Sequence, residues 1–344
     1  MRFGMFLAPH GFADTKSPTQ LYDEALEQAQ CADECGFDYV WLAEHDIVRY
    51  IITTDLLQLA VLIAQRTKRI RIGGAVFVTA FYHPLGLAGD IAQADHLTRG
   101  RFEPGLGRGG SPYELRQFQA FMPEADSRAR FAEFVDIVRK SWEHDHALEF
   151  HGRFFDFNNA FVTPRPYSRP HPRIWLAAIT PESVRFATEQ RFDVLFTAFR
   201  RPMDFIREAY ASFVDAGGPR PGSHGPTQFV LNRNMYIAPT MEEAQEVLPL
   251  IRYHDKVVGA GRIDAERVVD GMRVWDEGVQ LGSSDEEYLR NLPIGDPDTV
   301  LERIAEYKAL GIDQFSIYTA VGQDQRLVLR SMELFAKHVI PVLR

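Results

Sequence analysis

The sequence is poor in cysteine: only Cys31 and Cys35 occur among its 344 residues. Two cysteines exclude a disulfide framework, a four-thiolate zinc site and an iron–sulfur pattern. They stand four apart in a predicted helix and therefore share one face of it. Filling of the core or the surface is favoured over a redox pair.

Long apolar runs are also missing. No stretch approaches the roughly 18 uninterrupted apolar residues that a membrane span needs. The first ten residues hold one positive charge and an apolar run too short for a signal peptide. These absences predict a cytoplasmic protein with no membrane partner.

Positive charge is not in excess, because 38 Lys and Arg face 47 Asp and Glu, for a net charge of −9. This balance argues against a nucleic-acid partner, and it means that an anionic ligand must be held by a local site. The chain is 45% hydrophobic and 25% charged. That composition is typical of a globular protein and excludes disorder and fibres.

One junction recurs along the chain, in which a helical pattern ends and an apolar–Asp pair opens a short apolar run. It occurs at Phe37-Asp38, Phe192-Asp193 and Ile312-Asp313. A continuous apolar run, rather than an alternating one, is typical of a strand that is buried on both faces. Each junction therefore predicts a step from a helix to a parallel strand.

Run length and flanking breakers predict eight strands, at 2–8, 38–43, 70–78, 101–107, 173–178, 193–198, 228–237 and 313–319. Helical patterns lie at 18–34, 55–67, 84–99, 128–143, 181–190, 202–216, 297–310 and 325–341. Eight strands, most of them followed by a helix, predict an α/β fold of the (β/α)8 TIM-barrel type, with residues 1–344 as a single domain. Two segments are surplus to the barrel: 144–172, before strand five, and 241–295, after strand seven. The second is long enough to be a lid over a site.

Active sites of such barrels lie at the carboxyl ends of the strands. The residues that close the predicted strands are His10, Glu44, His45, Asp46, Thr79, Tyr82, His83, Arg108, Thr180, Phe199, Arg200 and Tyr318. In the sharpest cluster, Glu44-His45-Asp46, a histidine between two carboxylates can act as an acid or base near neutral pH. A polar cap on a barrel strand is the alternative. No close-spaced ligand pair occurs, so no metal site is predicted.

Two further motifs suit an anionic ligand. Gly105–Gly110 matches G-x-G-x-x-G but runs into Ser-Pro-Tyr-Glu instead of an apolar helix, which argues against a dinucleotide fold. Its glycines either leave room for a flat ligand, with Arg108 as a phosphate partner, or form a plain tight turn. Thr180-Pro181-Glu182-Ser183 begins a helix, whose amides either hold a phosphate or are simply capped.

Taken in order, several motifs resemble those of one known family over nearly the whole chain. They are Arg2-Phe3-Gly4-x-Phe6-Leu7, Glu34-Cys35-Gly36-Phe37-Asp38-x-Val40-Trp41-Leu42-x-Glu44-His45, Ile72–Val76 with His83-Pro84, Arg99–Phe102 with Gly107-Arg108-Gly109, Pro166–Arg169, and Met332-x-Leu334-Phe335 with Val339-x-Pro341. The chain resembles the bacterial luciferase-like family of flavin monooxygenases.

The resemblance implies an activity. A separate flavin reductase would supply reduced FMN, which reacts with O2 to a flavin 4a-hydroperoxide that oxygenates a small organic substrate. An apolar substrate is expected, because the intermediate must be kept from water and 25 Phe can line the pocket. A homodimer is also implied.

The resemblance also implies residue roles. His45 falls on the catalytic histidine and Glu44 on its neighbouring carboxylate. Ala75-Val76 falls on a non-prolyl cis peptide that lies against the flavin ring. Arg108 falls on the residue that pairs with the FMN phosphate. The loop and helix start around that phosphate correspond to Ala178, Ile179 and Ser183.

Three positions depart from the luciferase pattern. Asp46 replaces a second histidine, Gly107 replaces a reactive cysteine, and Ile179 replaces a serine of the phosphate loop. The departures argue against the light-emitting aldehyde reaction. They leave Arg108 and backbone amides as the main grip on the phosphate.

Other functions remain open. Members of the same superfamily move hydride with a deazaflavin cofactor, and others are noncatalytic flavin-binding proteins or partner subunits. Glu44-His45 and the Gly-Arg-Gly turn favour FMN, and His45 favours catalysis. An unrelated hydrolase or lyase would need a metal cluster or a lysine nucleophile at a strand end, and the sequence has neither.

Overall fold

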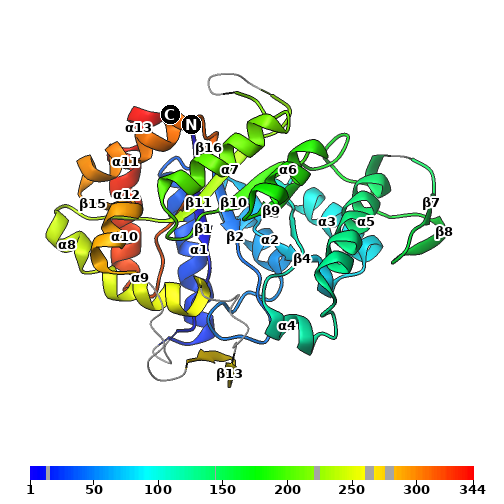
Figure 1. Ribbon diagram of the computed structural model, residues 1–344, viewed down its shortest axis with the longest axis horizontal. Helices are drawn as coiled ribbons and strands as arrows, with labels where there is room; N and C mark the ends of the chain where they lie inside the picture. Colours follow the sequence, from blue (N-terminus) through cyan, green and yellow to red (C-terminus); the bar gives the residue numbers. More distant parts are fainter. Residues whose placement is uncertain (13–15, 144, 221–224, 260–266, 276–282) are drawn as a thin grey trace.

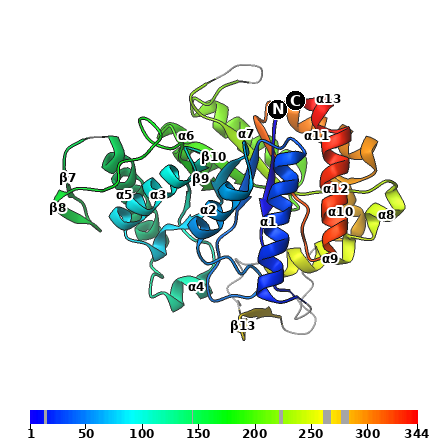
Figure 2. The same ribbon diagram turned by 180° about the vertical axis from the view of Figure 1, so that it is seen from behind.

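The computed structural model describes residues 1–12, 16–143, 145–220, 225–259, 267–275 and 283–344. Over these residues the protein is an α/β fold, in which a curled parallel sheet is surrounded by helices (Figures 1 and 2). Parts of the two surplus segments, at 144, 260–266 and 276–282, lie outside the described residues. In the described part of the chain, no helix is long and apolar enough to cross a membrane.

The main sheet has ten strands in the order β4-β6-β9-β10-β11-β16-β1-β2-β3-β5, and every pair is parallel. The bounds are β1 Arg2–Leu7, β2 Tyr39–Leu42, β3 Arg71–Gly74, β4 Phe77–Val78, β5 Phe102–Glu103, β6 Gly105–Gly107, β9 Trp175–Ala178, β10 Asp193–Thr197, β11 Phe229–Asn234 and β16 Gln314–Tyr318. Two predicted strands are split, 70–78 at Ala75-Val76 and 101–107 at Pro104. Because β3 pairs with β5 and β4 with β6, the strand order is that of the expected barrel.

The prediction of one strand over 228–237 is wrong at its end. Strand β11 ends at Asn234, and β12 (Tyr236–Ile237) leaves it to pair with β15 (Ile294–Gly295) in a separate small sheet. The apolar run continues across this break because both strands are buried. A run of apolar residues records burial and does not tell which strand pairs with which.

The helices around the sheet are α1 Pro18–Glu34, α2 Leu56–Arg66, α3 Pro84–Leu97, α5 Glu124–Glu143, α6 Pro181–Glu189, α7 Met203–Asp215, α11 Pro297–Leu310, α12 Gln325–His338 and α13 Ile340–Leu343. Side-chain caps set several starts: Ser17, Asp55 and Asp296 each accept a hydrogen bond from a backbone N–H of the first turn. Gly311, with φ of +106°, ends α11 in the left-handed conformation that glycine tolerates.

The first surplus segment forms a hairpin of β7 (Leu148–His151) and β8 (Asp156–Ala160), which projects from the side of the molecule (Figure 1). The second contains α8 Met241–Gln245, α9 Leu248–His254, the π-helix η2 Asp255–Gly259, β13 Arg267–Val269, β14 Met272–Val274 and α10 Asp285–Asn291. Outside the surplus segments, two short elements were not predicted: η1 (Thr79–Phe81) and α4 (Pro112–Gln117).

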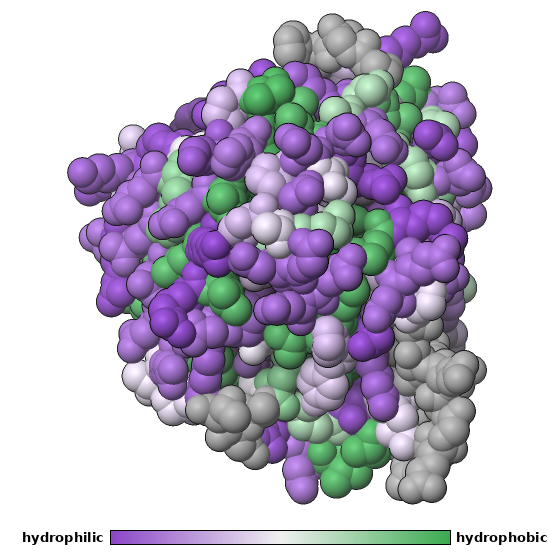
Figure 3. Space-filling view, turned by 90° about the vertical axis from the view of Figure 1, so that its left-hand side faces the viewer, coloured by the Kyte–Doolittle hydropathy of each residue, from purple (hydrophilic) through white to green (hydrophobic). Residues whose placement is uncertain are grey.

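Most of the core lies between the sheet and the helices, and a second cluster fills the inside of the curled sheet. The inner cluster is built on Tyr39, Trp41 and Trp175, whose ring centroids lie 5.1–6.4 Å apart. Glycine makes room for these rings, since a Cβ on Gly73 would lie 2.2 Å from the Trp41 ring. On the face shown in Figure 3, hydrophilic side chains predominate and apolar ones lie scattered among them.

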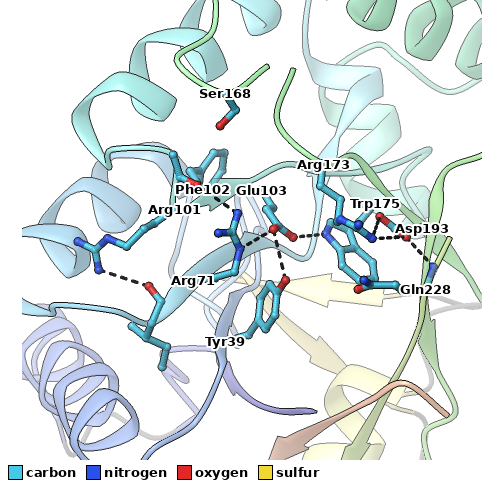
Figure 4. A network of polar contacts seen from close by, with 12 residues as sticks. Tyr39, Arg71, Arg101, Phe102, Glu103, Ser168, Arg173, Trp175, Asp193 and Gln228 are labelled. Atoms are coloured by element: carbon cyan, nitrogen blue, oxygen red, sulfur yellow. Dashed lines mark hydrogen bonds and ion pairs between the residues drawn. The ribbon is translucent and has the colours of Figure 1, made fainter. Parts of the chain in front are cut away.

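A paired polar network closes the amino-terminal end of the strands (Figure 4). The buried Glu103 carboxylate accepts hydrogen bonds from Arg71 Nε at 2.6 Å, Trp175 Nε1 at 2.7 Å and the Tyr39 hydroxyl at 3.3 Å. Beside it, Asp193 forms an ion pair with Arg173. We call Tyr39, Arg71, Glu103, Arg173, Trp175 and Asp193 the floor network. Its carboxylates have partners, so it holds the strands together at the end opposite His45.

Candidate active site

The predicted site residues come together at the carboxyl end of neighbouring strands. His45 follows β2, Ala75 and Val76 lie between β3 and β4, Arg108 follows β6, and Ala178 ends β9. These strands are neighbours in the sheet. The order of the elements along the chain therefore places them on one rim.

His45 is held by a carboxylate that the sequence did not point to. Its Nδ1–H donates to Glu114 of α4, at 2.9 Å from Oε2 and 3.2 Å from Oε1. Glu114 is 2% exposed and also accepts the Asp46 N–H at 2.8 Å. Burial opposes ionisation of Glu114, but the His45 imidazole and the hydrogen bonds from Asp46 and Ser111 lower the pKa of this carboxyl. The carboxylate form is therefore the one that orients the imidazole.

The rest of the His45 environment leaves one ring nitrogen for chemistry. Its backbone N–H donates to Thr53 O at 3.0 Å, and its ring packs edge-on against Tyr50. The side chain is 27% exposed, and the described residues provide a partner for Nδ1 only. A histidine held at one nitrogen can exchange a proton at the other.

Glu44 points away from His45 and supports the neighbouring segment. Its carboxylate accepts the Val78 N–H at 2.7 Å and the Tyr82 hydroxyl. Burial raises the pKa of Glu44 to about 8. The two carboxylates that flank His45 in sequence thus differ from the one that bonds its ring.

A flat, partly open shelf lies beside the histidine. The Ala75-Val76 peptide bond is cis, as the resemblance implies. Gly107 lies so close that a Cβ there would be 2.5 Å from Val76 Cγ2, which explains why the position cannot hold a larger side chain without a shift. Ala177 is exposed although its strand position faces the inside of the sheet. We call Ala75, Val76, Gly107 and Ala177 the shelf.

Positive charge adjoins the shelf. Arg108 Nη2 lies 3.0 Å from Glu124 Oε1, and Arg128 Nε lies 2.9 Å from the same oxygen. Glu124 is 64% exposed, so two guanidinium groups share one solvent-exposed carboxylate. A phosphate can take the place of such a carboxylate, because Arg binds both groups through the same planar fork.

The start of α6 is capped by its own side chains. Thr180 accepts the Ser183 N–H, and the Ser183 hydroxyl accepts the N–H groups of Ile179 at 3.2 Å and Thr180 at 3.1 Å. Ala178 is 1% exposed and packs in the outer core. A phosphate here would have to displace the Ser183 hydroxyl from those amides. Together, shelf and arginines fit a ligand with a flat ring and an anionic end, which is the chemistry of FMN.

Sequence reasoning missed Glu114, although a local signal was present. Ser111 caps α4, Pro112 occupies its first turn, and Glu114 stands at the third helical position. That spacing predicts a carboxylate that reaches back to the cap. Only the fold shows that it reaches His45 instead.

Other predicted strand-end residues contribute to the surroundings. Thr79 donates to Gly107 O at 3.0 Å, and His10 is hydrogen-bonded to Tyr318 at 2.7 Å. Arg200 forms an ion pair with Asp255 at the end of α9. His83 packs instead against Phe155 and Phe157 of the hairpin.

Residues 1–314 match the family described as luciferase-like monooxygenase. The chain therefore belongs to this family. It is 27% identical to the oxygenase component of the flavin-dependent trigonelline monooxygenase of Acinetobacter baylyi, over 99% of this chain and 95% of that protein.

Solved structures agree in fold. Monooxygenase RslO1 from Streptomyces bottropensis superposes with a TM-score of 0.84 at 27% identity, over all of both chains. The oxygenating constituent of 3,6-diketocamphane monooxygenase from Pseudomonas putida, solved with FMN, has a TM-score of 0.77 at 20% identity over 100% and 99% of the two chains. The coenzyme F420-dependent tetrahydromethanopterin reductase of Methanopyrus kandleri scores 0.71 at 19%, over 100% and 99%.

Proposed function

We propose that the protein is the oxygenase of a two-component flavin-dependent monooxygenase, which takes reduced FMN from a separate flavin reductase and uses O2 to oxygenate a small organic substrate. The observation that carries the proposal is His45, held by Glu114 through Nδ1 and placed beside the shelf and Arg108. The name of the Acinetobacter relative, an oxygenase component, supports a separate reductase.

FMN would lie with its ring on the shelf, against Ala75 and Val76, and with its phosphate at Arg108. Ala178, Ile179 and Ser183 would surround the phosphate from the start of α6, through backbone amides and the Ser183 hydroxyl. When bound in reduced form, FMN supplies the electrons that activate O2 for insertion of one oxygen atom. Every other part of the mechanism falls to side chains.

His45 would move a proton through Nε2, while Glu114 keeps Nδ1 protonated and the ring oriented. Glu44 would act through the shelf, because it holds the Val78 N–H two residues after Val76. Burial raises the pKa of Glu44 to about 8, whereas the hydrogen bonds that it accepts from Tyr82 and Val78 favour the carboxylate. We therefore keep Glu44 in the active site as a positioning residue.

The second surplus segment would exclude water as a lid. Val257 is buried in the inner cluster, and Val258 and Met272 pack against it. Gly271 accepts the Arg49 N–H at 2.8 Å, which ties the segment to the loop after β2. A covered site protects a reactive oxygenating species from hydrolysis.

At the level of the whole molecule, we propose a single (β/α)8 domain over residues 1–344. The 144–172 and 241–295 segments would be insertions before strand five and after strand seven. We further propose a cytoplasmic homodimer. Size-exclusion chromatography with light scattering tests the dimer directly.

A second candidate is a deazaflavin-dependent hydride-transfer oxidoreductase. The structural similarity to a coenzyme F420-dependent reductase supports this second candidate function. A noncatalytic flavin carrier is the third candidate, and the hydrogen-bonded His45–Glu114 pair argues against it, since a carrier has no use for an oriented imidazole.

Anaerobic titration with reduced FMN, followed by rapid mixing with O2, separates the three. A flavin absorption intermediate that persists after mixing is expected for the monooxygenase. Binding of reduced F420 in place of FMN would favour the hydride-transfer enzyme. FMN binding with immediate reoxidation would favour the carrier.

A further inference from the structure

A group of unpartnered polar atoms lines one side of the barrel interior near the carboxyl end of the strands. Asn232 and Asn234 of β11 and Ser316 of β16 are at most 6% exposed. Within the described residues, Asn232 Oδ1, Asn234 Nδ2 and Ser316 Oγ have no hydrogen-bond partner. Asn232 lies beside Ser316 and Asn234 beside Tyr318 in the strand register, so these side chains share the inner face.

His254 of α9 packs against Tyr318, which is the strand neighbour of Asn234. His254 is 1% exposed, and neither ring nitrogen has a partner in the part of the chain that the structure describes. Its ring stands edge-on to Tyr318, with centroids 4.7 Å apart, and to His10, 5.2 Å apart. We call Asn232, Asn234, His254 and Ser316 the polar wall.

The position of His254 is set by a strong anchor. In the next residue, Asp255, the two carboxylate oxygens lie 2.9 and 3.0 Å from the same Arg200 nitrogen, Nη1, and one of them also accepts the Tyr288 hydroxyl at 2.8 Å. These contacts fix the backbone next to His254, so the buried position of its imidazole is set by the fold. The anchor holds it over the ends of β1 and β16.

The polar wall carries no charge at neutral pH. Burial lowers the pKa of His10 to about 4 and that of His254 well below its usual range. His10 donates through Nδ1 to Tyr50 O and accepts the Tyr318 hydroxyl at Nε2. Of the cations nearby in the described part of the chain, Arg200 is paired with Asp255, and Arg273 donates to Val257 O and lies over the Tyr50 ring. The wall therefore presents neutral donors and acceptors side by side.

We propose that the polar wall recognises an uncharged substrate group with both a hydrogen-bond donor and an acceptor, such as a carboxamide or lactam. Buried polar atoms without partners cost free energy, which a ligand with matching groups recovers. A hydrocarbon leaves them unpaired, and the four wall residues themselves offer a carboxylate no cation. This substrate class rests on the proposed oxygenase function, and it narrows the expected apolar substrate to one with a polar end. Since α9 covers the wall, the ligand would enter as α9 moves from the strand ends.

Three probes of one shape test the inference: benzamide, benzoate and α-methylstyrene. They present a neutral donor–acceptor pair, an anion and an apolar group on the same ring. Their affinities for the FMN-loaded protein can be measured by isothermal titration calorimetry. We expect benzamide to bind at least tenfold more tightly than either of the others.

Two variants localise the effect. His254→Phe and Asn232→Leu keep the side-chain size and remove the polar atoms, and each is expected to reduce the preference for benzamide about tenfold, the equivalent of one hydrogen bond. Because an unpaired buried group is removed, the melting temperature without ligand should stay the same or rise. His151→Phe on the exposed β7 strand is the matched control and should change neither quantity.

Several results would overturn the inference. The inference is wrong if α-methylstyrene or benzoate binds as tightly as benzamide or more tightly. It is also wrong if none of the three probes binds at millimolar concentration. A lower melting temperature of His254→Phe with unchanged benzamide affinity would assign the ring a structural role. FMN titration without probes tests the proposed function separately. Failure there, with the benzamide preference retained in the flavin-free protein, would reject the oxygenase and keep the polar wall.

Discussion

The two ends of the barrel interior differ in how their buried polar groups are paired, although Gln314 at the amino-terminal end also has no side-chain partner among the described residues. In the floor network, the Glu103 carboxylate has three donors and Asp193 has an arginine partner. At the other end, the polar wall keeps buried atoms of Asn232, Ser316 and His254 without partners among the described residues.

We propose that the difference separates an end that serves the fold from an end that serves chemistry. Satisfied networks rigidify a structure, whereas partly satisfied ones cost stability and persist where a ligand completes them. Residues at the amino-terminal end of barrel strands are usually structural, and those at the carboxyl end are usually functional. The following predictions test this division.

The largest effect is expected at the carboxyl end. His45→Ala should lower oxygenation by about 10²–10⁴-fold, since that is the usual contribution of a positioned proton-transfer group. The protein should still fold, with some loss of thermal stability, because the buried Glu114 carboxylate loses its imidazole partner. Product formation with reduced FMN and O2 measures the first quantity, and His151→Ala serves as control.

Glu114→Gln should lower turnover by a smaller factor and alter its pH dependence, because the imidazole keeps its place but loses the facing negative charge. Full activity of His45→Ala would remove the proposed role of the histidine. An unchanged pH profile in Glu114→Gln would remove that of its partner.

The floor network should respond in stability instead. Glu103→Leu leaves Arg71, Tyr39 and Trp175 without their shared acceptor, and removing one member of a buried charged pair costs about 3–5 kcal/mol. Urea unfolding measures this change, while FMN affinity should stay as it is. Glu306→Leu, in an exposed pair with Arg303, should cost at most about 1 kcal/mol. Similar losses in both variants would contradict the division.

Acid should act on the carboxyl end through its buried histidines. Burial lowers the pKa of His10 from 6.5 to about 4. Between these two pH values the unfolded chain therefore binds a proton at His10 and the folded protein does not. The neutral ring therefore contributes stability that is complete above pH 6.5 and is lost as the pH falls toward 4. The loss from His10 is at most about 3 kcal/mol. The free energy of unfolding, measured with urea at pH 7 and at pH 4.5, should differ less between the two pH values in His10→Gln than in the wild type. An equal difference in both proteins would count against a neutral buried His10.

The smallest effect concerns the flavin phosphate. Arg108→Ala should weaken FMN binding by about 10–100-fold, as expected when a charge-assisted hydrogen bond worth about 1.5–3 kcal/mol is lost. Fluorescence titration measures it, with Arg139→Ala, which pairs with Asp136 along α5, as the control. Unchanged affinity in Arg108→Ala would place the phosphate elsewhere.

Much of the fold was readable because its signals are local. Helix α1 begins at Pro18 and α11 at Pro297, as predicted, since a capping side chain and a proline mark each start. Strand order followed from apolar runs and the helix-to-strand junctions. The end of β11 could not be read, because the apolar residues continue into β12.

The candidate site divides in the same way. His45 and Arg108 were identified because they close strands whose ends must meet on one rim. Glu114 and His254 were not, since each reaches the site from a separate segment, 69 residues after His45 in the case of Glu114. The spacing of residues along the chain does not predict contacts between segments so far apart in the sequence.

By itself, the sequence determined the succession of strands and helices, the family, and the identity of the residues at each strand end. Periodicity, caps and turns act over a few residues, so they are written in the local order of side chains. Only the tertiary structure decided which carboxylate holds His45, that Glu44 supports the shelf instead, and that His254 covers a wall of unpaired groups. Those contacts join distant segments, and they exist only once the packed barrel has brought them together.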